Sequence, residues 1–161
     1  MDDTKMDRIV GHYQKVGQLV HEMIPEEWEK VYIYGEMEAD GGAIFFYYYP
    51  SESDKPVYSL DIPELFEVDE EAFEELEDQL YPTLRASWKE FKDSPQEPWS
   101  TFTMIMDRSG KYEVKNGYED LSGIDLSDRY LAWRYKYLGI GPKSDYEKKC
   151  LEQYLKKVEN K

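Results

Sequence analysis

The stretch Trp28–Tyr49, WEKVYIYGEMEADGGAIFFYYY, predicts two paired β-strands at the centre of the fold. Its first part, Trp28–Met37, alternates its apolar and aromatic residues with the period of two that is typical of a strand. Asp40–Gly42 supplies residues suited to positive φ, so we expect a hairpin turn there. Ile44–Tyr49 is apolar on both faces, as in a central strand, and Pro50 ends it.

Helices are predicted on both sides of this hairpin. The apolar residues before it recur at steps of three and four, from Ile9 to Met23, and Pro25 should end that helix. After a short edge strand near Val57, a long helix should begin at the N-cap Asp69. Pro82 falls inside that helix, so we expect a kink or two abutting helices.

The rest of the chain predicts a second hairpin and two more helices. Trp99–Met106 and Lys111–Lys115 are typical of strands, and the turn residues Asp107–Gly110 lie between them. Two helices follow, over about 127–138, with Gly139 as the C-cap, and over about 144–158. The sequence therefore predicts a single domain over residues 1–161 with an α+β fold: a mostly antiparallel sheet built from hairpins, with N-terminal, central and C-terminal helices packed on it.

Negative charge dominates the composition. The chain has 35 acidic and 20 basic residues, a net charge of −15. The segment Asp61–Gln79 contains ten carboxylates and no Lys or Arg, whereas Lys143–Lys161 is mildly basic. Such a surface repels nucleic acid and anionic membranes and attracts a basic partner. The alternative interpretation of the same charge is solubility alone.

The few cysteines and histidines of the chain, and its lack of a recognisable targeting segment, bear on its compartment and on its catalytic chemistry. Cys150 is the only cysteine, the N-terminal residues do not resemble a signal peptide, and no apolar run is long enough to cross a bilayer, so we expect a cytoplasmic protein. His12 and His21 fall on opposite faces of one predicted helix and are interpreted as surface residues. Cys150 is interpreted as a half-buried packing residue despite its neighbours Lys148 and Lys149. We therefore expect no catalytic residue, no metal and no cofactor.

Several motifs of this chain resemble those of the YezG/EsaG-like immunity family. The longest is Met23–Glu36, MIPEEWEKVYIYGE, and the others follow in order over nearly the whole chain: Phe45–Tyr48, Leu65–Phe66, Glu97–Ser100, Asp107–Lys111, Tyr118–Asp120 and Trp133–Tyr135. The resemblance implies a non-enzymatic antitoxin that protects Gram-positive bacteria from nuclease toxins with LXG-type or related secretion domains, exported by a type VII secretion system. It carries no catalytic motif that could be transferred residue by residue.

Charge and resemblance together give a hypothesis for binding. A nuclease presents a basic groove to phosphates, and an acidic protein can cover that groove. The candidate partner-binding residues are Asp69, Glu70, Glu71, Glu74, Glu75, Glu77, Asp78, Glu113, Tyr118, Glu119, Asp120, Asp125 and Asp128. Outward tyrosines, among them Tyr32, Tyr34 and Tyr118, are candidate interface anchors.

Two other function classes remain open at this stage. A toxin-dedicated chaperone or scaffold would bind the toxin without inhibiting the nuclease. A metal-assisted hydrolase would use pairs from the many carboxylates, although their spacing selects none of them.

Overall fold

The computed structural model describes residues 3–93 and 98–159, and the chain divides into two compact units, residues 1–119 and 120–161. Glu97, the first residue of one of the similar motifs, lies outside the described residues. The prediction of a single domain stays a prediction, and each unit is described by itself.

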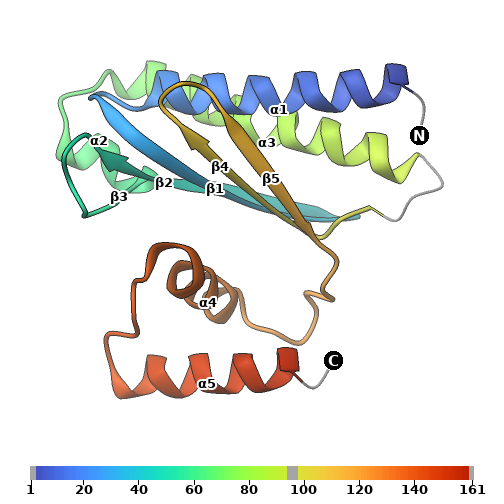
Figure 1. Ribbon diagram of the computed structural model, residues 1–161, viewed down its shortest axis with the longest axis vertical. Coiled ribbons are helices and arrows are strands. Elements are labelled where there is room, and N and C mark those ends of the chain that lie inside the picture. Colours follow the sequence, from blue (N-terminus) through green and yellow to red (C-terminus); the bar gives the residue numbers. More distant parts are fainter. Residues whose placement is uncertain (1–2, 94–97, 160–161) are drawn as a thin grey trace. The chain divides into compact units, whose positions relative to one another are not determined.

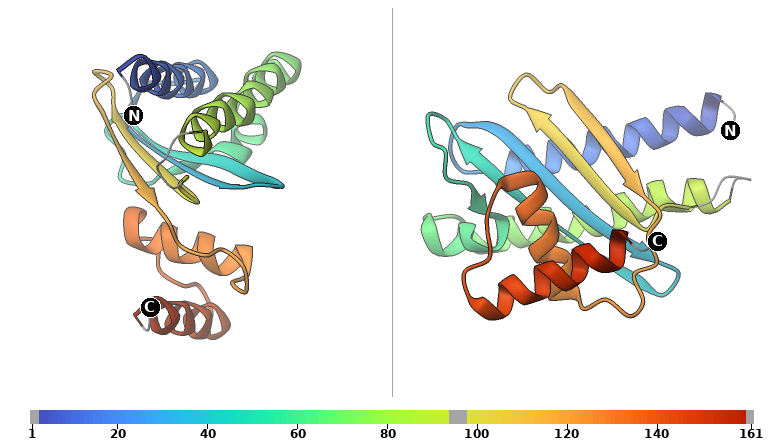
Figure 2. Two further views of the ribbon diagram at one scale, coloured as in Figure 1. Left: turned by 90° about the vertical axis from the view of Figure 1, so that its right-hand side faces the viewer. Right: turned by 60° about the horizontal axis from the view of Figure 1, so that its bottom comes forward.

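The first unit is a five-stranded antiparallel sheet with two long helices on one face (Figure 1). The strand order is β3-β2-β1-β4-β5. The helices α1 and α3 pack against each other over the sheet, as the left view of Figure 2 shows. The elements in chain order are α1 (Asp3–Met23), β1 (Trp28–Glu38), β2 (Gly41–Pro50), β3 (Val57–Tyr58), η1 (Ser59–Asp61), α2 (Ile62–Leu65), α3 (Glu70–Lys92), β4 (Thr101–Asp107) and β5 (Tyr112–Gly117).

The β1–β2 hairpin confirms the two central strands but not the reason given for its turn. Glu38 pairs with Gly41, so the turn residues are Ala39 and Asp40. The prediction of positive φ at Gly41 and Gly42 is wrong, because the glycines with positive φ lie elsewhere in the described chain. Gly42 is needed for space instead: a Cβ there would lie 2.1 Å from the backbone oxygen of Glu36.

Alternation along the strands builds the core between sheet and helices. On β1, Val31, Ile33 and Met37 are buried with residues of α1 and α3, whereas Tyr32 and Tyr34 lie on the opposite face of the sheet. Tyr34 is buried, and its hydroxyl donates a hydrogen bond to Glu36. The prediction that Tyr34 points outward as an interface anchor is therefore wrong.

The long helix α3 begins as predicted and runs through its proline. Asp69 is the N-cap, and the helix continues past Pro82 as one element to Lys92, not as two abutting helices. Its buried face carries Leu84 and Trp88, and the Trp88 indole N–H donates to the backbone oxygen of Trp99 at 2.7 Å. Helix α1 ends at Met23, just before Pro25, as predicted.

The β4–β5 hairpin forms one edge of the sheet and confirms the second predicted turn. Gly110 has φ +90°, its N–H donates to the oxygen of Asp107, and the Asp107 N–H donates to the oxygen of Lys111. β4 begins at Thr101, two residues later than predicted.

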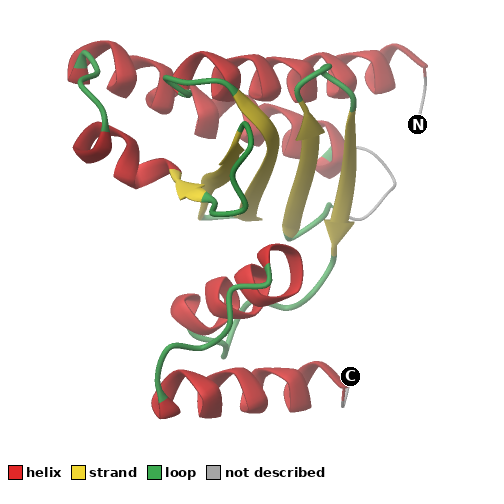
Figure 3. Cartoon of the chain, turned by 60° about the vertical axis from the view of Figure 1, so that its left-hand side comes forward, coloured by secondary structure: helices red, strands yellow, loops and turns green. Residues whose placement is uncertain are grey.

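The second unit is a pair of helices, α4 (Leu126–Leu138) and α5 (Asp145–Glu159). Gly139 has φ +69° and ends α4, which confirms the predicted C-cap. Leu131, Ala132 and Leu151 form a small buried cluster between the two helices, with Cys150 and Tyr154 at its edge. Figure 3 marks the helices and strands of both units, and together they confirm an α+β fold with N-terminal, central and C-terminal helices.

Candidate functional site

The first half of α3 presents a dense group of carboxylates to solvent. The helix buries Phe73 and Leu80 beneath it. On its other sides Glu70, Glu71, Glu74, Glu75 and Asp78 are exposed, and Glu77 is half-buried. We call these six residues, together with the N-cap Asp69, the acidic helix surface. The structure therefore brings together the seven candidate residues that lie between positions 69 and 78 of the sequence.

Among the described residues, no lysine or arginine forms a salt bridge with the acidic helix surface. Glu70 and Glu74, and likewise Glu71 and Glu75, are four residues apart on one helix, where like charges repel. The salt bridges Arg8–Glu90 and Arg108–Glu29 do not involve this surface. Partial burial, followed by the charges of Asp78 and Glu74, raises the pKa of Glu77. These carboxylates destabilise one another, and a basic partner would relieve that repulsion.

Asp69 has a structural role within the same surface. Its Oδ1 accepts hydrogen bonds from the backbone N–H groups of Glu71 at 3.1 Å and Ala72 at 3.3 Å. These bonds satisfy two of the donors that a helix N-terminus leaves unpaired. One carboxylate oxygen of Asp69 is thus committed to the fold.

The candidates near β5 lie away from the acidic helix surface. Glu113 alternates with Val114, whose side chain packs on the core beneath α1 and α3, so Glu113 lies on the opposite face of the sheet. Glu119 accepts a hydrogen bond from the Thr101 hydroxyl at 3.0 Å and so joins the two ends of the hairpin. Tyr118 is 55% exposed, so it remains a candidate anchor residue for an interface.

The last three candidates belong to the second unit. Asp120 accepts hydrogen bonds from the backbone N–H and the hydroxyl of Ser122, an arrangement typical of a local turn. Asp125 holds the N-cap position of α4 without a side-chain capping bond, and Asp128 lies in the first turn. The assignment of all thirteen residues to toxin binding stays a prediction.

His21 is exposed and His12 is half-buried on α1, in keeping with the prediction of helix-surface residues, whereas Cys150 packs at the edge of a buried cluster. His21 Nδ1 accepts a hydrogen bond from the Trp28 indole at 3.2 Å. Burial, and then the nearby carboxylates of Asp128 and Asp125, raises the pKa of the Cys150 thiol, which disfavours the nucleophilic thiolate. Cys150 is half-buried, as predicted, and the carboxylates of Asp128 and Asp125 act on its thiol in addition to the neighbouring lysines of the sequence.

Within the described residues, no group of three or more His, Cys, Asp or Glu side chains is placed to hold a metal ion. The same described residues include no helix that is both long enough and apolar enough to cross a membrane.

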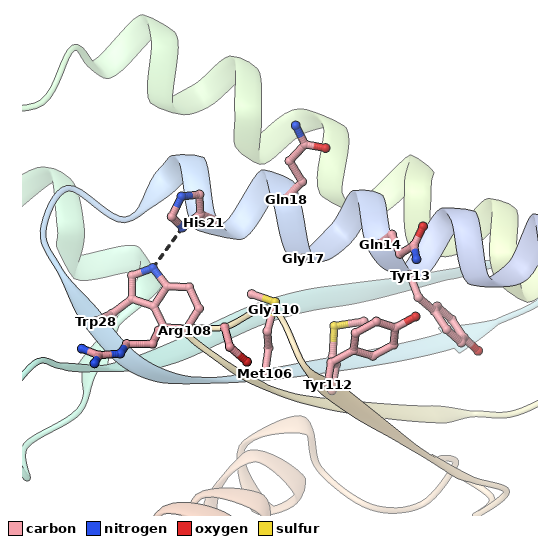
Figure 4. Close-up of a pocket in the computed structure, with 12 residues that line it drawn as sticks. Tyr13, Gln14, Gly17, Gln18, His21, Trp28, Met106, Arg108, Gly110 and Tyr112 are labelled. Atoms are coloured by element: carbon pink, nitrogen blue, oxygen red, sulfur yellow. Dashed lines mark hydrogen bonds between the residues drawn. The ribbon is translucent and has the colours of Figure 1, made fainter.

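A groove of about 330 Å³ between α1 and the β4–β5 hairpin was missed by sequence reasoning. Figure 4 shows Tyr13, Gly17 and His21 of α1 along it, with Trp28, Met106 and Tyr112 below. Burial raises the pKa of Tyr13 to about 12, so its phenol stays neutral. The spacing of Tyr13, Gly17 and His21 by four was the available signal, because it places a small residue between two aromatic rings on one helix face.

The groove lining contains no carboxylate, although it belongs to the most acidic part of the chain. Its twelve residues are Tyr13, Gln14, Gly17, Gln18, His21, Trp28, Met104, Met106, Arg108, Ser109, Gly110 and Tyr112. The first unit therefore carries two surfaces of opposite character, one crowded with acids and one without them.

Comparison with known proteins gives consistent matches over most or all of the chain. A family model described as "Immunity protein YezG-like" matches residues 9–152. The chain is 34% identical to "Immunity protein YezG" of Bacillus spizizenii, covering 100% of this chain and 99% of that protein. It is 31% identical to "Immunity protein YezG" of Bacillus subtilis, covering 89% of this chain and 96% of that protein.

A staphylococcal relative extends the same match. The chain is 31% identical to "Type VII secretion system protein EsaG" of Staphylococcus aureus, covering 98% of each chain. The resemblance seen in the motifs thus holds over nearly the full length of three proteins. On the family model and these relatives together, the chain belongs to the YezG-like immunity protein family.

Proposed function

We propose that this chain is a cytoplasmic, non-catalytic immunity protein that binds a secreted nuclease toxin, of the LXG-type or a related class, and neutralises it through the acidic helix surface. Family membership supports the immunity role, and the name of the staphylococcal relative supports a link to type VII secretion. The observation that carries the proposed surface is the uncompensated group of carboxylates on the first half of α3.

Electrostatics gives this surface a mechanism. A nuclease must gather positive charge where it binds phosphates, and the carboxylates of α3 offer a competing set of negative charges. Long-range attraction speeds the encounter, whereas desolvated contacts formed after docking slow dissociation. Binding a basic surface would also relieve the like-charge repulsion that, after burial, raises the pKa of Glu77.

The direct test titrates the full chain into the nuclease domain of a candidate cognate toxin, while DNA cleavage is followed. Loss of cleavage at one equivalent is expected. Binding without loss of cleavage would favour the chaperone function instead, and absence of binding would contradict the proposed partner.

Charge reversal tests the surface itself. The triple variant Glu70→Lys, Glu74→Lys and Asp78→Lys should bind the toxin at least tenfold more weakly, and its affinity should depend less on salt, roughly as steering predicts. The matched control reverses three exposed acids elsewhere in the first unit, Asp7→Lys, Asp40→Lys and Asp54→Lys, with the same change in net charge. Equal losses in both triple variants would show that total charge acts, and not the acidic helix surface.

A further inference from the structure

The sheet of the first unit ends on one side at β5, whose outer backbone pairs with no strand within the described residues. Figures 1 and 3 show β5 at the border of the sheet beside β4. Six residues, Tyr112–Gly117, form this edge. An edge of this length is a template for strand addition, which proteins either block or use.

The hydrogen bonds of the hairpin determine which residues of β5 direct their backbone N–H and C=O groups away from β4. The Asp107 N–H donates to the oxygen of Lys111, so this pair is hydrogen-bonded, and pairing alternates along the ladder from there. Glu113 and Lys115 therefore direct their backbone groups toward β4. The backbone N–H and C=O groups of Tyr112, Val114 and Asn116 point away from the sheet and are the ones available to another strand.

Charge and strand overlap together select one register for pairing with a second copy of β5. Among antiparallel registers that join the outward groups, centring on Glu113 places two glutamates opposite each other, and centring on Lys115 places two lysines opposite each other. Centring on Val114 places Glu113 of each copy opposite Lys115 of the other. In that register Val114 pairs with Val114 of the second copy, and Tyr112 with Asn116, through outward backbone groups. A register centred on Tyr112 would also pair Glu113 with a lysine, Lys111, but it pairs fewer residues of the strand Tyr112–Gly117.

The groove beside β5 is compatible with the same partner. A two-fold axis normal to the sheet leaves α1 of both copies, and with it both grooves, on one face. Their lining carries no carboxylate in a unit with 28 acidic residues, and a basic partner would gain no ion pair with an acid there. A second copy brings a groove lining that is equally free of carboxylates.

We propose that the chain self-associates through β5, as an antiparallel pair about a two-fold axis at Val114 that joins two five-stranded sheets. The exposed side chains of Glu113 and Lys115 form reciprocal cross-strand pairs in this dimer. The surface is distinct from the acidic helix surface, and the proposal does not depend on toxin binding.

Cysteine cross-linking tests the axis. In a Cys150→Ser background, Val114→Cys places two thiols on the axis, where the Cα atoms of a hydrogen-bonded pair lie about 5.5 Å apart, within disulfide range. The matched control is Asn116→Cys, whose thiols in the same dimer are separated by roughly 14 Å along and across the strands. Mild oxidation should link the first variant and not the second. Equal or absent linking in both would overturn the proposal.

Charge exchange tests the register without cysteines. By sedimentation equilibrium at about 0.15 M salt, where repulsion between whole chains is largely screened, wild type should dimerise. Glu113→Lys or Lys115→Glu alone should weaken the dimer about tenfold, because attraction becomes repulsion at two symmetric positions. The double variant should recover wild-type association. A monomeric wild type at all concentrations, or failure of the double variant to recover while remaining folded, would overturn the proposal.

Discussion

The two units of this chain differ sharply in charge. Residues 1–119 contain 28 acidic and 11 basic residues, a net charge of −17, whereas residues 120–161 contain seven acidic and nine basic residues, a net charge of +2. The acidity that the composition reports for the whole protein thus belongs to the unit with the sheet. A basic partner attracted over long range is directed to that unit.

The units also differ in how they are stabilised. The first has a continuous core between its sheet and two long helices, with Leu84, Phe46 and Phe102 fully buried. The second has a cluster of Leu131, Ala132 and Leu151 between two helices. Stability increases with the apolar area that a fold buries. The strong negative charge is therefore carried by the first unit, whose larger core can best offset the repulsion between its carboxylates.

Core truncation should give the largest effect and separate the units. Leu84→Ala should lower the free energy of unfolding by about 3 kcal/mol, because it leaves a cavity under α3. Leu151→Ala should instead speed amide exchange in α4 and α5 while leaving exchange in the sheet unchanged. Urea unfolding and hydrogen exchange measure the two outcomes. Faster exchange throughout the sheet in Leu151→Ala would show that the units open together.

Removing the N-cap should give an intermediate effect confined to the acidic unit. Asp69→Ala should lower the free energy of unfolding by about 1 kcal/mol, because two backbone donors lose their acceptor. Asp69→Ser keeps an acceptor and removes the charge, so its stability should stay close to wild type. Urea unfolding compares them, and equal losses would mean that charge matters at this position and capping does not.

Single-charge removal should give the smallest effects, opposite in sign in the two units. The raised pKa of Glu77 means that the folded chain favours its protonated form. The stabilisation from Glu77 is therefore complete below the unfolded pKa and is lost as pH rises through the folded pKa. Glu77→Gln should raise the free energy of unfolding by a few tenths of a kcal/mol at neutral pH, and this gain should vanish below about pH 4.

The matched variant in the second unit is Glu152→Gln. Glu152 lies four residues from both Lys148 and Lys156 on α5, so its removal should cost a few tenths of a kcal/mol at neutral pH. Urea unfolding of both variants at neutral pH and near pH 4 measures the difference. Stabilisation by both substitutions would contradict a local origin of the charge effects.

Most of the fold was predictable because local chemistry and tertiary packing agree. Pro25, Asp69, Gly110 and Gly139 begin or end elements where the sequence places them. Prediction failed where a distant contact decides. Gly42 is required by the close approach of Glu36, and Trp99 lies before β4 because its backbone oxygen accepts the Trp88 indole.

The candidate site was predictable where its residues are contiguous and unpredictable elsewhere. The carboxylates of α3 gather because helical spacing alone brings them together. Glu113 was grouped with them by charge, yet the two-residue alternation of β5 places it on the other face of the sheet. The groove was missed because it joins α1 to a hairpin about ninety residues later in the chain, which no local pattern reports.

The two borders of the sheet are unequal. β3 has two residues, and the chain turns at once into η1 and α2, whereas β5 has six. If two copies join through β5, each uses up this longer strand, and the outer borders of the product are β3 and the part of β2 that β3 does not pair. Because a β5–β5 pair leaves no further β5 edge, addition through β5 stops at two chains and does not grow a fibre.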